Sequence, residues 1–198
     1  TKRKVIIPVF VPHKGCPNDC VFCNQRKITG KTVPAVAEDV DVAVNERLGT
    51  IDPSVDDIEI AFFGGSFTMI PVEEQEALLY EAQKYVMSGL VKDIRISTRP
   101  DGIDSPSMDR LRRFGVTIVE LGVQSMSNEV LMRTKRGYES RQVEEAIDLL
   151  KENGFLVGVQ VMTGLPGATV ESDVESAVRL CRMKPDMARI YPTLVIKD

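Results

Sequence analysis

Short apolar runs alternate with longer segments of helical periodicity along this chain. The apolar runs predict strands near residues 4–11, 57–63, 92–98, 116–122, 155–162 and 187–191. Between them, apolar residues recur at spacings of three and four, which predicts helices near residues 35–48, 72–88, 104–114, 127–133 with 140–153, and 169–183. The expected strands lack a strict apolar–polar alternation, which is typical of a parallel sheet that is covered on both faces.

This βα repeat predicts an α/β fold built from parallel strands. Parallel βα units wind with one hand and curl toward a barrel when enough of them follow one another. Six strands make an incomplete barrel, so we predict a partial, three-quarter (β/α)6 barrel similar to a TIM barrel. A doubly wound open sheet would fit the same periodicity. No helical segment follows the sixth strand before Asp198, so we expect the C-terminal covering helix to be missing and residues 1–198 to be one domain of a longer chain.

The composition fits one soluble globular core, because 43% of the 198 residues are hydrophobic and 27% are charged. The chain has 25 Lys and Arg against 29 Asp and Glu, a net charge of -4, which argues against coating nucleic acid through bulk electrostatics. The best candidate for a local basic patch, or else a solvated helix end, is the set Arg133, Lys135, Arg136 and Arg141.

The first apolar stretch, residues 5–11, is interrupted by Pro8. It is too short to cross a membrane or to act as the apolar region of a signal peptide. We therefore expect a cytoplasmic protein without a membrane partner.

Three of the four cysteines, Cys16, Cys20 and Cys23, are crowded into the segment CPNDCVFC, while Cys181 lies on the expected helix 169–183 and faces outward. This crowding does not suit a disulfide framework and indicates metal binding. Three thiolates on one loop can hold three irons of a [4Fe–4S] cluster and leave the fourth iron without a protein ligand. A structural zinc site would need a fourth ligand, for which His13 is near in sequence. Inert buried thiols are the remaining alternative.

The CxxxCxxC spacing, with Phe22 before the last cysteine and a strand before the first, resembles the radical S-adenosylmethionine (SAM) superfamily. Within it, the chain is similar to the branch of the Elongator catalytic subunit and oxygen-independent coproporphyrinogen III oxidase, through the ordered blocks PHKGCPNDCVFC, FFGGSFT, ISTRPDGI, VELGVQS, KRGY, VMTGLPGAT and RIYPTLVIK. The resemblance covers essentially the whole chain. It implies a radical SAM core domain over residues 1–198, with a [4Fe–4S] cluster on Cys16, Cys20 and Cys23.

The same resemblance implies a SAM site at the strand ends. Gly64 and Gly65 would let the methionyl amino group approach the backbone, and Arg136 would grip the SAM carboxylate. Gln160 would contact the ribose, and the turn 164–167 would frame the adenine. The full implied set is Gly64, Gly65, Ser66, Ser97, Gln124, Arg136 and Gln160. Each position also has a plain structural alternative, such as a tight turn, a strand end or a surface arginine.

Three further charged residues have two alternatives each. Glu120 either faces the SAM ribose or pairs with an arginine inside the barrel. Arg99 and Asp101 either reach the cofactor or substrate, or pair with each other on the surface.

The resemblance implies an enzyme that cleaves SAM reductively to a 5′-deoxyadenosyl radical. The Elongator-like side suggests modification of a tRNA wobble uridine, and the coproporphyrinogen oxidase side suggests decarboxylation of tetrapyrrole propionates. A non-catalytic, zinc-stabilised binding module is the alternative from a different class. The implied partners are tRNA or a small-molecule substrate and an electron donor such as flavodoxin or ferredoxin.

Overall fold

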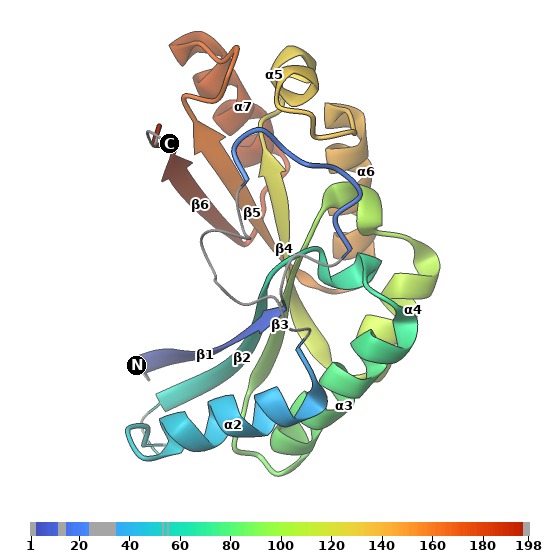
Figure 1. Cartoon of the computed structure of the whole chain (residues 1–198), viewed down its shortest axis with the longest axis vertical. Helices are drawn as coiled ribbons and strands as arrows, with labels where there is room; N and C mark the ends of the chain where they lie inside the picture. The colour runs from blue at the N-terminus through green and yellow to red at the C-terminus, as the bar shows by residue number, and fades with distance from the viewer. Residues whose placement is uncertain (1–2, 12–14, 24–34, 53, 55, 196–198) are drawn as a thin grey trace.

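The computed structural model describes residues 3–11, 15–23, 35–52, 54 and 56–195 (Figure 1). Its strands form one parallel sheet, and their order in the sheet is their order in the chain. The strands are β1 (Arg3–Val11), β2 (Asp56–Gly64), β3 (Asp93–Thr98), β4 (Val116–Gln124), β5 (Leu156–Thr163) and β6 (Met187–Pro192). A doubly wound sheet would reverse this order at a switch point. The partial barrel is therefore confirmed, and the doubly wound alternative is wrong.

The helices cover the convex side of the curled sheet and leave its concave side open (Figure 1). They are α2 (Ala37–Leu48), α3 (Val72–Met87), α4 (Ser105–Arg113), α5 (Asn128–Arg133), α6 (Ser140–Glu152) and α7 (Val170–Arg182), with short 3-10 turns at Phe67–Met69 and Pro100–Gly102. The expected elements are all present. Their bounds agree with the expected ones to within two residues, and β4 runs on to Gln124 through a shift of register between Gly122 and Gln124.

Alternation along the strands sends one set of side chains to the helices and the other to the concave face. Ile60, Ile96 and Val159 lie in the core between the sheet and the helices, and α6 closes that core with residues such as Val143 and Ile147. On β6, by contrast, Ile190 is exposed.

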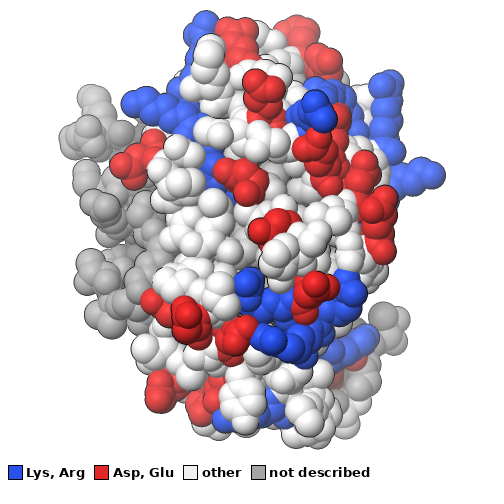
Figure 2. Space-filling view, turned by 90° about the vertical axis from the view of Figure 1, so that its right-hand side faces the viewer, with Lys and Arg blue, Asp and Glu red and all other residues white. Residues whose placement is uncertain are grey.

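Acidic and basic side chains are intermixed over the face seen in Figure 2. Ion pairs among the described residues include Arg113 with Glu76 and Arg179 with Glu144. Among the described residues, no helix is both long and apolar enough to span a membrane.

The concave face carries charges at buried positions of neighbouring strands. Glu59 of β2, Arg95 of β3 and Glu120 of β4 are each at most 2% exposed. Arg95 pairs with Glu59 on one side and lies 3.7 Å from Glu120 on the other. Lys4 reaches Glu59 at 2.9 Å, and Arg189 Nε lies 2.9 Å from Glu120 Oε1. These five residues, the inner ladder, alternate in sign, so Glu120 pairs with arginines inside the barrel.

The start of α4 offers a test of local structure. Asp104 caps this helix by accepting a hydrogen bond from Ser107 N at 2.8 Å, and Ser107 Oγ accepts one from Asp104 N in return. Asp104→Ala should lower the free energy of unfolding by about 1 kcal/mol, measured by urea denaturation, because the backbone N–H of Ser107 loses its side-chain acceptor. Asp109→Ala, at an exposed position of the same helix, is the control and should not destabilise the protein. Equal destabilisation by both substitutions would contradict the capping role.

Candidate functional site

A cavity of about 590 Å³ lies on the concave side at the carboxyl ends of the strands. Its wall includes every residue that the sequence assigned to SAM binding, namely Gly64, Gly65, Ser66, Ser97, Gln124, Arg136 and Gln160. Cys16 and Cys23 line it as well. Residues from all six strands thus meet in one place, as expected at this edge of a parallel sheet. The turn 164–167 does not line this cavity, and its Gly167 packs against Arg133 instead.

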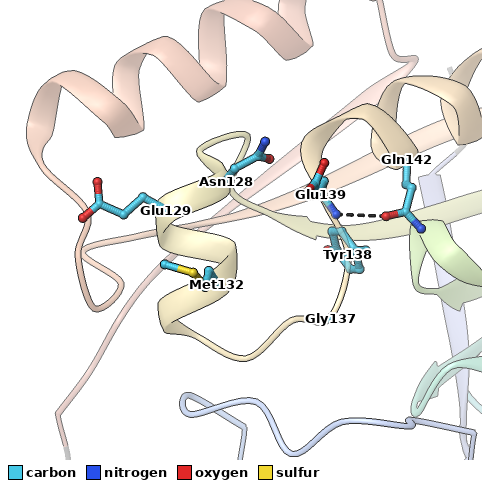
Figure 3. A pocket seen from close by; sticks show the side chains of 7 residues that line it. All are labelled: Asn128, Glu129, Met132, Gly137, Tyr138, Glu139 and Gln142. Atoms are coloured by element: carbon cyan, nitrogen blue, oxygen red, sulfur yellow. Dashed lines mark hydrogen bonds between the residues drawn. The ribbon is translucent and has the colours of Figure 1, made fainter.

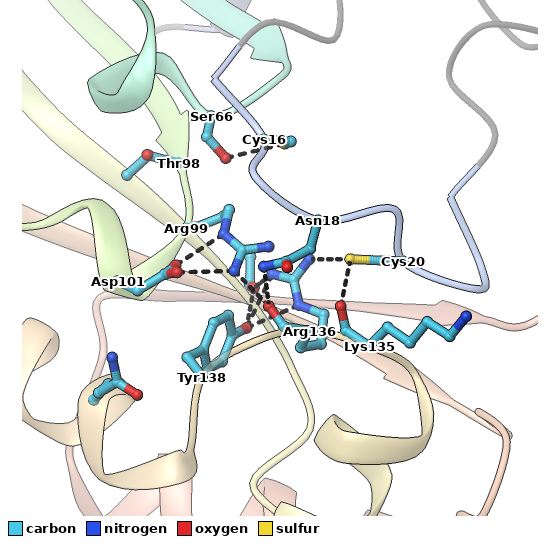
Figure 4. Close-up of polar contacts among 12 residues, drawn as sticks. Cys16, Asn18, Cys20, Ser66, Thr98, Arg99, Asp101, Lys135, Arg136 and Tyr138 are labelled. Atoms are coloured by element: carbon cyan, nitrogen blue, oxygen red, sulfur yellow. Dashed lines mark hydrogen bonds and ion pairs between the residues drawn. The ribbon is translucent and has the colours of Figure 1, made fainter.

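The cysteine loop, residues 15–23, lies beside the end of β4 and the turn after α5 (Figure 4). Cys16 Sγ is 3.3 Å from Ser66 Oγ, and the buried Cys20 Sγ lies 3.3 Å from Arg136 Nη1. The amide of Cys23 donates to the carbonyl of Cys20 at 2.9 Å. Contacts from outside the loop therefore hold it at Cys16 and Cys20, and the bond from Cys23 to Cys20 forms a turn within it.

The loop offers three thiols and, within the described part of the chain, no group of three or more Cys, His, Asp or Glu side chains is arranged around a single metal ion. A tetrahedral zinc site needs four ligands around one ion, whereas a [4Fe–4S] cluster with one open iron takes three thiolates, one on each of the other irons. By the chemistry of the donors, the three cysteines fit such a cluster. His13, the fourth ligand considered for zinc, lies outside the described residues.

Cys181 lies on α7 and is exposed, as the helical pattern indicated. It belongs to neither the cysteine loop nor the lining of the cavity. This position makes it a natural control for the three loop cysteines.

Arg136 is buried, so the expectation of a surface arginine is wrong. Its Nε and Nη2 donate to Tyr138 Oη at 3.1 and 2.9 Å, and Nη2 also donates to the Gly122 carbonyl at 2.6 Å. Burial by itself lowers the pKa of the guanidinium, but Tyr138 and Cys20 outweigh it, and the pKa of Arg136 lies above its ordinary value. The edge that would bind a carboxylate through two parallel bonds is thus already used, and only Nη1 retains a spare N–H.

The expected basic patch does not form as one surface. Arg136 is inside, while Arg133 pairs with Glu129 and Arg141 pairs with Glu145 on their own helices. Such pairs four residues apart follow helix geometry and leave little free charge for a ligand.

Arg99 and Asp101 pair with each other through two hydrogen bonds of 2.8 Å. The expected pairing is confirmed, but the expected surface location is wrong, since Arg99 is 2% exposed and lines the cavity. Arg99 Nη1 and Gln124 Oε1 are buried and have no hydrogen-bond partner in the part of the chain that the structure describes. An unmet buried donor or acceptor costs about 1–3 kcal/mol. A polar ligand in the cavity would remove this cost.

Two backbone features mark the site as specialised. Gln124 has φ of 68°, a left-handed conformation that is uncommon for a residue with a side chain and is often found at functional sites. Gly64 has φ of 114°, and an added Cβ would lie 2.6 Å from the carbonyl oxygen of Val11. The close approach of β1 thus requires a glycine at position 64. This confirms the structural role considered for Gly64, and a ligand can still approach its backbone.

The sequence analysis missed several side chains of the concave face that line the cavity. These are Phe10, Phe63, Met162, Arg189 and Tyr191. Phe10, Phe63 and Met162 alternate with core residues along their strands, and this period of two is the signal that could have found them. On β6 the alternate residue Ile190 is exposed, so Arg189 and Tyr191 had no such signal. A second pocket, of about 650 Å³, is formed by α5, α6 and the turn between them, and none of its lining residues is a cysteine (Figure 3).

The fold and the cysteine loop define the class of the protein, and comparison with known families agrees. The model of the radical SAM superfamily matches residues 10–181, and the chain belongs to this superfamily of enzymes. The chain is 32% identical, over 97% of its length, to the tRNA uridine(34) acetyltransferase of Methanocaldococcus jannaschii, of which it covers 43%. It is 33% identical over 77% of its length to the human Elongator complex protein 3, of which it covers 31%. The chain thus spans less than half of either relative.

Solved structures share the fold. Elp3 of Methanocaldococcus infernus superposes with a TM-score of 0.76 at 24% identity, covering 99% of this chain and 47% of that one. Coproporphyrinogen III oxidase (HemN) of Escherichia coli gives a TM-score of 0.67 at 20% identity, with 98% and 45% covered. The methyltransferase TsrM of Kitasatospora setae, solved with a [4Fe–4S] cluster and cobalamin, gives 0.66 at 16% identity, with 94% and 34% covered. These likenesses support the partial barrel.

Proposed function

We propose that this chain is the core of a radical SAM enzyme that acts on the wobble uridine of tRNA. The observation that carries the proposal is the cavity at the strand ends, where two of the loop cysteines and the whole implied SAM set meet. The tRNA uridine(34) acetyltransferase of M. jannaschii, similar over 97% of this chain, supports the choice of substrate.

The cluster in this proposal is held by Cys16, Cys20 and Cys23. Thiolates are the ligands that iron–sulfur clusters take in proteins, and three of them leave one iron open for SAM. Once bound, the cluster supplies the electron that cleaves SAM reductively. The protein binds and orients the cofactor and keeps water from the reacting atoms.

The SAM-binding residues are assigned to the walls of the cavity. Gly64 and Gly65 leave the backbone accessible for the amino group, with Ser66 beside them, and Gln124 Oε1 offers an acceptor that has no hydrogen-bond partner among the described residues. Ser97 and Gln160 add polar groups from β3 and β5. Arg136 joins this set through its one spare Nη1 N–H, because its other edge is engaged by Tyr138 and Gly122.

The proposal includes an electron donor such as flavodoxin or ferredoxin, since the cluster must be reduced before SAM is cleaved, and a cytoplasmic location. A second candidate function is decarboxylation of tetrapyrrole propionates. The likeness of the fold to coproporphyrinogen III oxidase favours it.

The test is SAM cleavage by the anaerobically reconstituted chain under dithionite, with 5′-deoxyadenosine measured by chromatography. We expect 5′-deoxyadenosine to form, and to form faster with a tRNA that carries uridine at position 34. The same tRNA with cytidine at that position is the matched control and should have no such effect. Equal stimulation by both tRNAs would remove the wobble uridine from the proposal. Stimulation by coproporphyrinogen III alone would favour the second candidate.

A further inference from the structure

The cysteine loop is held from a distant part of the chain. Three successive carbonyls of the turn after α5 accept from it: Thr134 O from Val21 N at 3.2 Å, Lys135 O from Cys20 Sγ at 3.8 Å, and Arg136 O from Asn18 Nδ2 at 3.2 Å (Figure 4). We call residues 134–137 the docking turn. The loop therefore rests on a structure more than a hundred residues away in sequence.

The docking turn is fixed independently of the loop. It ends α5 with a double cap, in which Arg136 N donates to Leu131 O at 2.9 Å and Lys135 N donates to Met132 O at 3.0 Å. Lys135 takes the left-handed conformation, with φ of 58°, that this cap requires. Thr134 is fully buried and donates through Oγ1 to Val130 O at 2.7 Å. The docking turn therefore keeps its conformation through contacts with its own helix, α5.

The fit between Asn18 and the docking turn requires a glycine. Gly137 has φ of 78°, and an added Cβ would lie 2.2 Å from Asn18 Nδ2 and 2.9 Å from Asn18 Cγ. Gly154, at the end of α6, has almost the same backbone conformation, with φ of 79°, but nothing lies within 4 Å of its added Cβ. The close approach of Asn18 is thus specific to Gly137.

The Cys20 sulfur contacts the docking turn twice, at the Lys135 carbonyl and at Arg136 Nη1. Only the second contact can persist when the sulfur binds a metal. Ligation by iron removes the thiol proton, so the S–H donation to Lys135 O belongs to the metal-free protein. The Arg136 Nη1 donation, at 3.3 Å, needs no proton on the sulfur and strengthens when the sulfur is a thiolate. The amide of Asn18 likewise does not depend on the metal.

We propose that Asn18 is a positioning residue, which docks the cysteine loop on Gly137 and the Arg136 carbonyl and so arranges the three thiols before iron arrives. Ordering the loop in advance lowers the entropy that cluster binding must overcome. The proposal rests on the cluster site proposed above. It adds that the loop is held by protein contacts and not by the metal alone.

The test compares Gly137→Ala with the matched control Gly154→Ala, since both place alanine at the same left-handed conformation. In the metal-free protein, amide hydrogen exchange at residues 18–23 should become about tenfold faster in Gly137→Ala and should not change in Gly154→Ala, a ratio on the scale of one lost hydrogen bond with its packing. After reconstitution, a chelator should remove iron faster from Gly137→Ala than from wild type, and at the wild-type rate from Gly154→Ala. Both variants should lose stability in urea through the same backbone strain, and Gly137→Ala should lose more, because it alone displaces Asn18.

A second pair of variants replaces asparagine by aspartate, which has the same shape. Asn18→Asp replaces the donor to Arg136 O by an acceptor, and Asn153→Asp does the same to a bond of 2.7 Å with Leu149 O, far from the site. Amide hydrogen exchange at residues 18–23 should become faster in Asn18→Asp, as in Gly137→Ala. In Asn153→Asp it should stay at the wild-type rate. Unchanged exchange in both loop variants would overturn the docking proposal. If the variants show the expected changes in exchange but the wild-type protein binds no iron, the proposed cluster site is overturned. The role of Asn18 in positioning ligands is then overturned with it.

Discussion

Replacing any one of Cys16, Cys20 or Cys23 by alanine should abolish the formation of 5′-deoxyadenosine from SAM. Each cysteine supplies the only protein ligand to one iron in the proposed cluster, so no neighbouring residue can take over its part. The measurement is 5′-deoxyadenosine produced under dithionite, together with iron and sulfide content after anaerobic reconstitution. We expect turnover to fall by at least about a hundredfold, since loss of the cluster removes the electron source.

Cys181→Ala is the control for these three variants. Cys181 is exposed on α7 and outside the cavity, so its removal should leave both the cluster and SAM cleavage unchanged. Loss of iron from Cys181→Ala would contradict the assignment of three ligands. Retention of full activity by any of the three loop variants would contradict it as well.

Among the substitutions proposed for this protein, Arg95→Met should lower the free energy of unfolding the most. Arg95 lies between Glu59 and Glu120 at the centre of the inner ladder, and all three side chains are almost completely buried. Removing one partner of a buried ion pair leaves an uncompensated charge, which costs about 3–5 kcal/mol. Urea denaturation of the metal-free protein should show this loss in the free energy of unfolding.

The control for Arg95→Met is Lys92→Met, which breaks an exposed ion pair of 2.8 Å with Asp57 beside the same strand. Exposed pairs contribute little because water screens them. If Arg95→Met does not fold, the variant that also replaces Glu59 and Glu120 by Gln should recover folded protein. A single Arg95→Met variant as stable as Lys92→Met would show that the inner ladder does not stabilise the barrel.

The sequence predicted the elements and the class of fold because local patterns carry that information. Apolar runs such as 57–63 are nearly continuous in parallel strands, and the helices show their own period, as in Val143, Ile147 and Leu150. The cavity could also be predicted, since the carboxyl ends of parallel strands meet at one edge. Residues placed at those ends, such as Gly65 and Gln124, therefore fell on its wall.

Other parts of the site depend on contacts that no local pattern contains. A run of basic residues resembles a solvated surface, yet Arg136 turns inward because Tyr138 and the Gly122 carbonyl accept its N–H groups. Arg99 and Asp101 are neighbours in sequence, and their pairing could be expected from that. The burial of Arg99 depends on the docking turn, because Arg99 also donates to the carbonyl of Arg136. The sequence analysis assigned no role to Asn18, and only the fold brings it against Gly137.

The central claim, that the three cysteines hold a [4Fe–4S] cluster, is tested most directly by one optical spectrum with an iron and sulfide count. After anaerobic reconstitution the account predicts a brown protein with broad absorption near 400 nm and about four irons and four sulfides per chain, the composition of a [4Fe–4S] cluster. A colourless protein that carries one tetrahedral zinc on the same cysteines and no sulfide would contradict it.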